Sequence, residues 1–156
     1  MKPKSHPLFL KTDKQSIVIN DIYDRKIRRW MTGECFDMAI AIQEKFPRLI
    51  FVGLHSESFP DHVGVLLPDN RIADARGIMT PTDFAHKQLG GDPEQIFKVD
   101  IEVVKTMCGL WHPENQPMPV SQELKKARSM AKKEIIPVIK SLMKTMEMET
   151  DIHPVC

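Results

Sequence analysis

The chain has 156 residues, a length that fits one domain with a substantial buried core. Its 22 basic and 21 acidic residues leave a formal net charge of +1, so the overall charge indicates no nucleic acid or other polyanion as a partner. Three widely spaced cysteines form neither a disulfide framework nor a CxxC metal motif, and an odd number fits a reducing compartment.

The first 14 residues are polar and contain prolines, so we expect them to lie along the surface. Their one apolar run, residues 8–10, is too short for the core of a signal peptide, and no run in the chain approaches the length of a membrane span. We therefore expect a cytoplasmic protein without a membrane-spanning segment.

A first helix is predicted from Ser16, a suitable N-cap, to about Trp30. Tyr23 and Trp30 are expected to pack in the core, and Gly33 breaks the helix. The apolar residues near helical spacing are Ile19, Ile22, Tyr23, Ile27 and Trp30.

A second helix is predicted from Cys35 to about Phe46, where Pro47 follows and ends it. Apolar residues three, four and seven positions after Cys35 place this cysteine at the leading edge of a buried face. These residues are Met38, Ala39 and Ile42. The continuous apolar run at 49–54 is suited to a strand at the centre of a sheet.

An antiparallel hairpin comes next. Residues 62–67 and 71–75 have the composition of strands and flank a turn sequence at 68–70, and Gly77 closes the second strand. Downstream, Thr80 caps a short helix with Pro81 at its first position, and this helix is expected to stop at residues 90–91.

The remaining segments are a strand, a loop and a long helix. Apolar residues alternate over 98–104, which predicts a strand, and 109–119 is a proline-rich loop. Ser121 caps a final helix to about Met148, and Pro137 is expected to kink or divide it. The fold class is therefore α+β, with N-terminal helices packed on a small antiparallel sheet and a long C-terminal helix. We expect a single domain over 1–156, with a core at about 15–104 and a helical extension at about 120–148.

Three residues in the central stretch suggest chemistry: Cys35, His62 and Asp74. A cysteine is a useful nucleophile only as a thiolate, which a helix N-terminus and a nearby imidazolium both favour. His62 and Asp74 each lie about six residues from the hairpin turn, so they should fall nearly opposite one another with side chains on the same face. The carboxylate would then orient the imidazole and stabilise its cation.

Other assignments remain open at this stage. Asp61 is an alternative carboxylate, and His55 with Glu57 is a second, weaker polar set. A zinc ion held by Cys35, His62 and Asp74 is chemically possible. The backbone N–H of Cys35 would face a developing oxyanion, and its second donor would come from near Gly33, Trp30 or Arg29. The residues expected to be structural or incidental are Cys108, His112 and Cys156.

The pattern G-x-C-x-x-x-A, followed by an apolar strand and H-V-x-V-x-x-P-D-x-R-x-x-D-A-x-G, resembles the papain-like superfamily over roughly residues 30–80. It is most similar to the transglutaminase-like branch, and to small bacterial and phage proteins of papain-like type. The resemblance implies that Cys35 is the nucleophile, His62 the general base and Asp74 the orienting acid. Where an aromatic residue commonly follows the histidine in that branch, this chain has Gly64.

The sequence thus predicts a cysteine-dependent hydrolase or acyltransferase acting on an amide or peptide carbonyl, of peptidase, deamidase or transglutaminase type. A protein or peptide substrate is expected, and no cofactor is indicated. The alternative is a non-catalytic binding or regulatory protein, of phage or effector type, on the same scaffold. In either case the C-terminal helix is a candidate surface for homodimerisation or for docking a partner.

Overall fold

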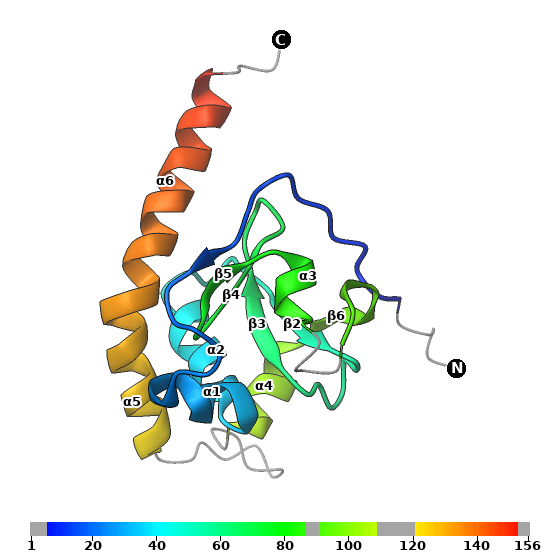
Figure 1. Cartoon of the computed structure of the whole chain (residues 1–156), viewed down its shortest axis with the longest axis vertical. Coiled ribbons are helices and arrows are strands. Elements are labelled where there is room, and N and C mark those ends of the chain that lie inside the picture. The colour runs from blue at the N-terminus through cyan, green and yellow to red at the C-terminus, as the bar shows by residue number, and fades with distance from the viewer. Residues whose placement is uncertain (1–5, 87–90, 109–120, 153–156) are drawn as a thin grey trace.

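The computed structural model describes residues 6–86, 91–108 and 121–152 and shows a mixed α/β chain with a six-stranded antiparallel sheet (Figure 1). The strand order is β1-β5-β4-β3-β2-β6. The strands are β1 (Ile17–Val18), β2 (Phe51–Leu54), β3 (Val63–Leu66), β4 (Ile72–Asp74), β5 (Gly77–Met79) and β6 (Ile96–Val99). The predicted hairpin is formed by β3 and β4, and β2 lies inside the sheet between β3 and β6.

Helix α2 (Cys35–Gln43) lies against one face of the sheet, where it contacts β3 and β4 (Figure 1). Other helices pack around it, which explains why α2 is apolar on most sides. The remaining helices are η1 (Arg25–Ile27), α1 (Arg28–Thr32), α3 (Pro81–Phe84), η3 (Pro93–Gln95), α4 (Ile101–Met107), α5 (Gln122–Met130), η4 (Ala131–Ile135) and α6 (Ile136–Ile152). A second, smaller core on the opposite face is built around Phe84 of α3.

The prediction of a helix from Ser16 to Trp30 is wrong. Residues 17–18 form the edge strand β1, and only 25–32 are helical. The Ser16 hydroxyl accepts a hydrogen bond from the Thr80 N–H at 2.9 Å and donates one to the carboxylate of Asp83. Tyr23 is 75% exposed rather than packed in the core, whereas Trp30 is buried as expected.

A physical reason for this difference is the cluster of Asp and Asn residues at 20–24, since these residues favour turns over helix interiors. The Asp21 carboxylate accepts from the Tyr23 N–H and the Asp24 carboxylate from the Lys26 N–H. The Ile19 and Asn20 N–H groups bond to the Arg76 carbonyl instead of joining a helix.

The predicted strand over 98–104 is also partly wrong, because β6 ends at Val99 and α4 begins at Ile101. The Asp100 carbonyl accepts hydrogen bonds from the N–H groups of Val103 and Val104 at 3.1 and 3.3 Å, which starts the helix. The alternating apolar residues over 98–104 belong partly to the end of a strand and partly to the start of a helix. Their spacing therefore does not reflect a single type of secondary structure.

Helix boundaries are confirmed at their beginnings more often than at their ends. Helix α2 begins at Cys35 but ends at Gln43, before the predicted Phe46. Helix α3 has Thr80 as its cap, whose hydroxyl accepts from the Asp83 N–H, but ends at Phe84 rather than near residue 90. The predicted loop at 109–119 lies outside the described residues.

The long C-terminal helix is confirmed, with the Ser121 hydroxyl accepting from the Leu124 N–H at its start. The helix is not divided at Pro137: it continues through this residue, and a π-helical turn, η4, ends two residues before it, with the Ile136 N–H reaching back to the Ala131 carbonyl. Helix α6 then runs past the sheet (Figure 1). No helix in the described part of the chain is long and apolar enough to span a bilayer.

Candidate catalytic site

The structure brings Cys35, His62 and Asp74 to one end of the sheet. Cys35 is the first residue of α2, His62 immediately precedes β3, and Asp74 is the last residue of β4. All three are buried, with exposed fractions of 2%, 0% and 2%. Their roles in catalysis stay a prediction, but their proximity is a property of the fold.

The hairpin register explains how His62 meets Asp74. Val65 pairs with Ala73 and Leu66 with Ile72, and continuing this register places Asp74 opposite position 64. His62 and Asp74 are therefore diagonal neighbours on one face, offset by two residues from the direct opposition that the turn length suggested. The His62 Nε2 atom lies 2.9 Å from Asp74 Oδ2.

Gly64 stands where the transglutaminase-like pattern commonly has an aromatic residue, and the absence of a side chain at this position has a steric reason. A Cβ atom at this position would lie 2.6 Å from Ile72 Cγ2 and 2.8 Å from Phe84 Cε1. The Phe84 ring packs against His62 with 5.1 Å between ring centroids. Phe84 of α3 thus supplies an aromatic contact to the imidazole from a different part of the chain.

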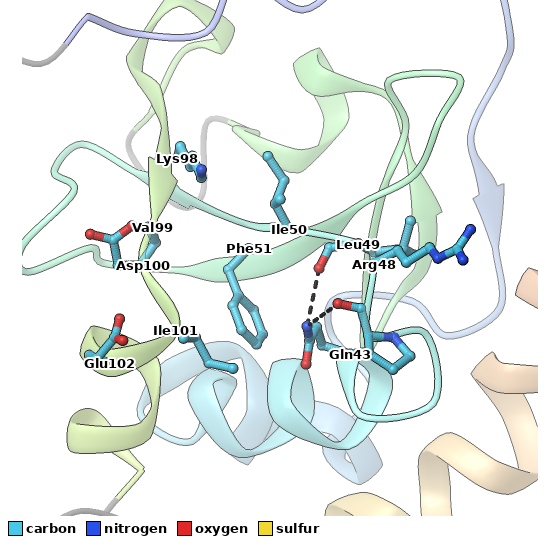
Figure 2. Close-up of a pocket in the computed structure, with 11 residues that line it drawn as sticks. Gln43, Arg48, Leu49, Ile50, Phe51, Lys98, Val99, Asp100, Ile101 and Glu102 are labelled. Atoms are coloured by element: carbon cyan, nitrogen blue, oxygen red, sulfur yellow. Dashed lines mark hydrogen bonds between the residues drawn. The ribbon is translucent and has the colours of Figure 1, made fainter.

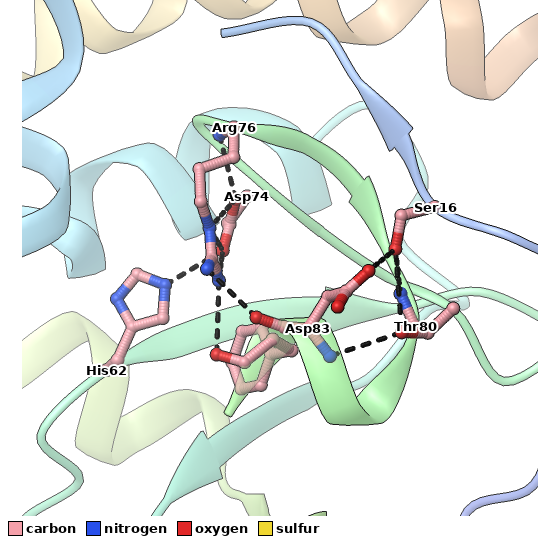
Figure 3. Close-up of polar contacts among 7 residues, drawn as sticks. Ser16, His62, Asp74, Arg76, Thr80 and Asp83 are labelled. Atoms are coloured by element: carbon pink, nitrogen blue, oxygen red, sulfur yellow. Dashed lines mark hydrogen bonds and ion pairs between the residues drawn. The ribbon is translucent and has the colours of Figure 1, made fainter. Parts of the chain in front are cut away.

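Arg76, which the sequence reasoning missed, is bound to the same carboxylate (Figure 3). Its Nη2 and Nε atoms donate to Asp74 Oδ2 at 2.7 and 3.1 Å, and its backbone N–H donates to Oδ1 at 2.8 Å. The guanidinium is buried, and its other donors reach the carbonyls of Asp83 and Phe84. The D-x-R spacing was the signal in the sequence, because it places the arginine N–H and side chain within reach of the aspartate.

The electrostatics favour an imidazolium beside a carboxylate. Burial alone would lower the pKa of His62, but the hydrogen bond with Asp74, the nearby Cys35 and the negative charge of Asp74 outweigh it and raise the pKa to about 8. Burial opposes ionisation of Asp74 as well, yet the charge of Arg76 and the contact with His62 hold the pKa of its carboxyl well below the usual range.

The second ring nitrogen of His62 is available to the thiol. Nδ1 is buried and has no partner in hydrogen-bond geometry, while Cys35 interacts with the ring closely enough to raise its pKa. Asp74 therefore occupies one ring nitrogen and leaves Nδ1 without a hydrogen-bond partner. This is the division of tasks that a thiolate–imidazole–carboxylate site requires.

The start of α2 also carries two acidic residues that the sequence reasoning passed over. Burial and the nearby Glu34 raise the pKa of Asp37 to about 6, and burial and Glu123 raise the pKa of Glu34. Each has a buried carboxyl oxygen without a hydrogen-bond partner, Glu34 Oε2 and Asp37 Oδ1. Glu34 and Asp37 are thus two titratable groups close to Cys35 at the start of α2.

The alternative residues lie elsewhere or are otherwise engaged. Asp61 pairs with His55 on the connection between β2 and β3, with 2.5 Å between Oδ2 and Nδ1, and Arg29 pairs with Glu123 at 3.0 Å. Trp30 is buried with its Nε1 donor unpaired, so it remains a candidate oxyanion donor.

No group of three or more His, Cys, Asp and Glu side chains within residues 6–86, 91–108 and 121–147 is arranged to hold a metal ion. The zinc alternative therefore has no ligand set in the described structure. Both oxygens of Asp74 are already engaged, by His62 and Arg76.

A cavity of about 290 Å³ lies at the other end of α2. Figure 2 shows the residues that line it. Gln43 lines it and donates to the carbonyls of Pro47 and Leu49, and charged residues Lys98 and Glu102 lie on its far side. Gln43 is roughly 12 Å along the helix from Cys35, at 1.5 Å per residue, so this cavity is not an entrance to the candidate catalytic site.

Comparisons of the chain with protein-family models, with curated proteins and with solved structures gave no match. Only the geometry of the site and the sequence pattern within it therefore bear on the function of the chain.

Proposed function

We propose that this chain is a cysteine-dependent hydrolase or acyltransferase on a papain-like, transglutaminase-like core, with Cys35 as nucleophile, His62 as general base and Asp74 as orienting acid. The observation that carries the proposal is the buried His62 ring. One nitrogen is 2.9 Å from the Asp74 carboxylate, and the other is unpaired and near Cys35.

In the proposed reaction, His62 takes the proton of the Cys35 thiol, and the thiolate attacks the carbonyl carbon of an amide or peptide substrate. A carbon–sulfur bond forms, and N–H groups at the start of α2 stabilise the oxyanion. The carbon–nitrogen bond then breaks, and the amine leaves with the proton from His62. Water or a second amine then loses a proton to His62 and attacks the acyl-thioenzyme carbonyl; the carbon–sulfur bond breaks, and Cys35 leaves as the thiolate. Hydrolysis and acyl transfer therefore share every step but the last.

A protein or peptide is the proposed substrate, and the cytoplasm the proposed location, since the thiol must stay reduced. Neither Cys35 nor Cys108 is in a disulfide. The three buried side chains imply that a substrate reaches the thiol only after part of the surrounding surface opens.

The test is the pH dependence of iodoacetamide alkylation of Cys35, followed by mass spectrometry in the folded protein and in His62→Ala. We expect the wild-type rate to reach a plateau well below the pKa of about 8.5 of an ordinary thiol, and His62→Ala to lose this plateau and react at least about tenfold more slowly at pH 6. Cys108, which is buried and donates its S–H to the Lys105 carbonyl, is the internal reference.

His55→Asn is the matched control, because His55 belongs to the other His–Asp pair and Asn tolerates its backbone φ of 75°. It should leave the Cys35 profile unchanged. A wild-type profile that follows an ordinary thiol, or one that His62→Ala does not alter, would contradict the nucleophile assignment.

The second candidate function is a non-catalytic binding or regulatory protein on the same scaffold. The burial of all three site residues favours it, because a closed site serves stability without chemistry. This candidate predicts that Cys35 reacts no faster than Cys108 at any pH between 6 and 8. The candidate binding surface would then be α6 and the residues around it.

A further inference from the structure

The guanidinium of Arg76 is bonded directly to the carboxylate of Asp74, the acid of the proposed site. The Arg76 side chain is 3% exposed, and its guanidinium donates to both oxygens of Asp74, with 2.7 Å for the shortest bond. We call such an Asp-x-Arg pair, in which the arginine side chain bonds to the aspartate two residues before it, a fork. Two carbonyls of α3 fix the guanidinium from the other side. Its Cζ atom also lies 6.0 Å from the centroid of the Phe84 ring, and the same ring contacts His62. Arg76 and His62 thus both bond to the Asp74 carboxylate and both contact the Phe84 ring.

The charges of this buried cluster sum to zero only when Arg76 is included. The ionised form of the proposed site contains a thiolate, an imidazolium and a carboxylate, with a net charge of −1. Arg76 adds the missing positive charge, and a buried group of charges is stable only when they are paired and hydrogen-bonded. Asp83 does not change this balance, because its carboxylate is turned to Ser16 and it offers Arg76 only its carbonyl (Figure 3).

We infer that Arg76 is a positioning residue of the proposed site: it fixes the orientation of Asp74 toward His62 and makes the buried Cys35–His62–Asp74 cluster electrically neutral in its reactive form. This inference rests on the proposed function for its catalytic consequence. Its effect on Asp74 and His62 does not depend on whether Cys35 reacts.

A purely local role has to be distinguished from this one. The chain holds a second Asp-x-Arg fork, Asp69 with Arg71, at the hairpin turn, where Arg71 Nη2 lies 2.7 Å from Asp69 Oδ2. The imidazole bonds to Asp74 and not to this fork. Arg71→Gln is therefore the matched control for Arg76→Gln: each removes one buried guanidinium from a fork of the same spacing.

The experiment compares wild type, Arg76→Gln, Arg76→Lys and Arg71→Gln after circular dichroism has shown that each is folded. The first readout is the pH profile of Cys35 alkylation, and the second is the pKa of His62 from an NMR titration. Loss of a positive charge favours protonation of every neighbouring group. We therefore expect Arg76→Gln to move the acid limb of alkylation and the pKa of His62 upward by about one pH unit, a tenfold change in the equilibrium.

Arg76→Lys keeps the charge and loses the fork, so it should stay within about half a unit of wild type in both readouts while slowing alkylation at the plateau. Arg71→Gln should lower stability without moving either profile. A folded Arg76→Gln with an unchanged His62 pKa would overturn the inference. If that variant does not fold, an Arg76→Lys protein whose His62 pKa moves by a full unit would overturn it.

The two proposals fail separately. An ordinary thiol profile in wild type would end the catalytic proposal, yet the His62 titration would still decide the role of Arg76. A reactive Cys35 whose profile ignores Arg76→Gln would leave the catalytic proposal in place and remove Arg76 from the site.

Discussion

The two ends of β4 carry the same local motif in different surroundings. At the hairpin turn, the Arg71 N–H and Nε donate to the two oxygens of Asp69 at 3.1 and 2.9 Å. At the other end of the strand, the Arg76 N–H and Nε donate to Asp74 in the same way, at 2.8 and 3.1 Å. The Asp-x-Arg spacing therefore builds the fork by itself, whatever surrounds it.

What differs is the third group that each fork meets. Arg71 directs its Nη1 to the Gln15 carbonyl, and its aspartate is partly exposed at the turn. Asp74 is buried and also binds His62, which places an imidazole and then Cys35 next to the fork. The Asp-x-Arg fork forms from local sequence. It becomes part of a candidate site only where the tertiary structure brings a titratable side chain against it.

The largest expected difference between the forks is in stability. Asp74→Asn leaves Arg76 buried without its counter-charge and should lower the free energy of unfolding by about 3–5 kcal/mol. Asp69→Asn should cost only about 1–2 kcal/mol, because its fork lies at the turn and Arg71 keeps the Gln15 carbonyl. Urea unfolding of the two variants measures both values.

The double variant Asp74→Asn/Arg76→Gln sharpens this comparison. It removes the uncompensated charge along with its partner, so it should recover part of the stability lost in Asp74→Asn. If Asp69→Asn lowers the free energy of unfolding as much as Asp74→Asn does, burial of the Asp74–Arg76 fork does not contribute the expected extra stability.

The next effect is a dependence of stability on pH that arises at the Asp74 fork, from His62. The folded protein binds the His62 proton more tightly than the unfolded chain, with a pKa of about 8 against 6.5. The resulting stabilisation is fully present below pH 6.5 and is lost as the pH rises through 8. The shift corresponds to about 2 kcal/mol at most. Urea unfolding at intervals from pH 6 to pH 8.5 should show this decline.

His62→Gln should remove the decline, and Asp69→Asn should leave it unchanged. Asp37, with a raised pKa of about 6, loses its own contribution between about pH 3.8 and 6, below the window that reports on His62. A wild-type stability that is flat or rises between pH 6.5 and 8 would show that the imidazolium is not favoured by folding.

Local sequence rules predicted the parts of this fold that local interactions decide. Thr80 and Ser121 cap helices, Gly33 and Cys35 mark the start of α2, and the turn at 68–70 joins two strands. The contact between His62 and Asp74 was also predictable, since it follows from the length of one hairpin, although its register was offset by two residues.

The errors arose where distant segments decide the structure. Ile17 and Val18 join the sheet because they pair with β5. The sequence of residues 16–30 alone does not predict that pairing. The contact of Phe84 with His62 depends on α3 folding back over the hairpin. The Asp74–Arg76 pair was predictable from its spacing, but its burial was not, because Arg76 is enclosed by α3 and by residues 19–20, which bond to it from distant parts of the chain.

The smallest expected difference concerns the residues at the centre of each fork. Asn70 has a φ of 70°, and its side chain bonds to the Lys11 carbonyl at an exposed site. Asn70→Gly relieves the left-handed backbone but loses this bond, so it should change stability by no more than about 0.5 kcal/mol. Ala75 is fully buried, and Ala75→Gly loses a packed methyl group, which should cost about 1 kcal/mol. Thermal unfolding of both variants at pH 7 tests the difference, and equal effects would mean that the two forks do not differ in packing as the structure indicates.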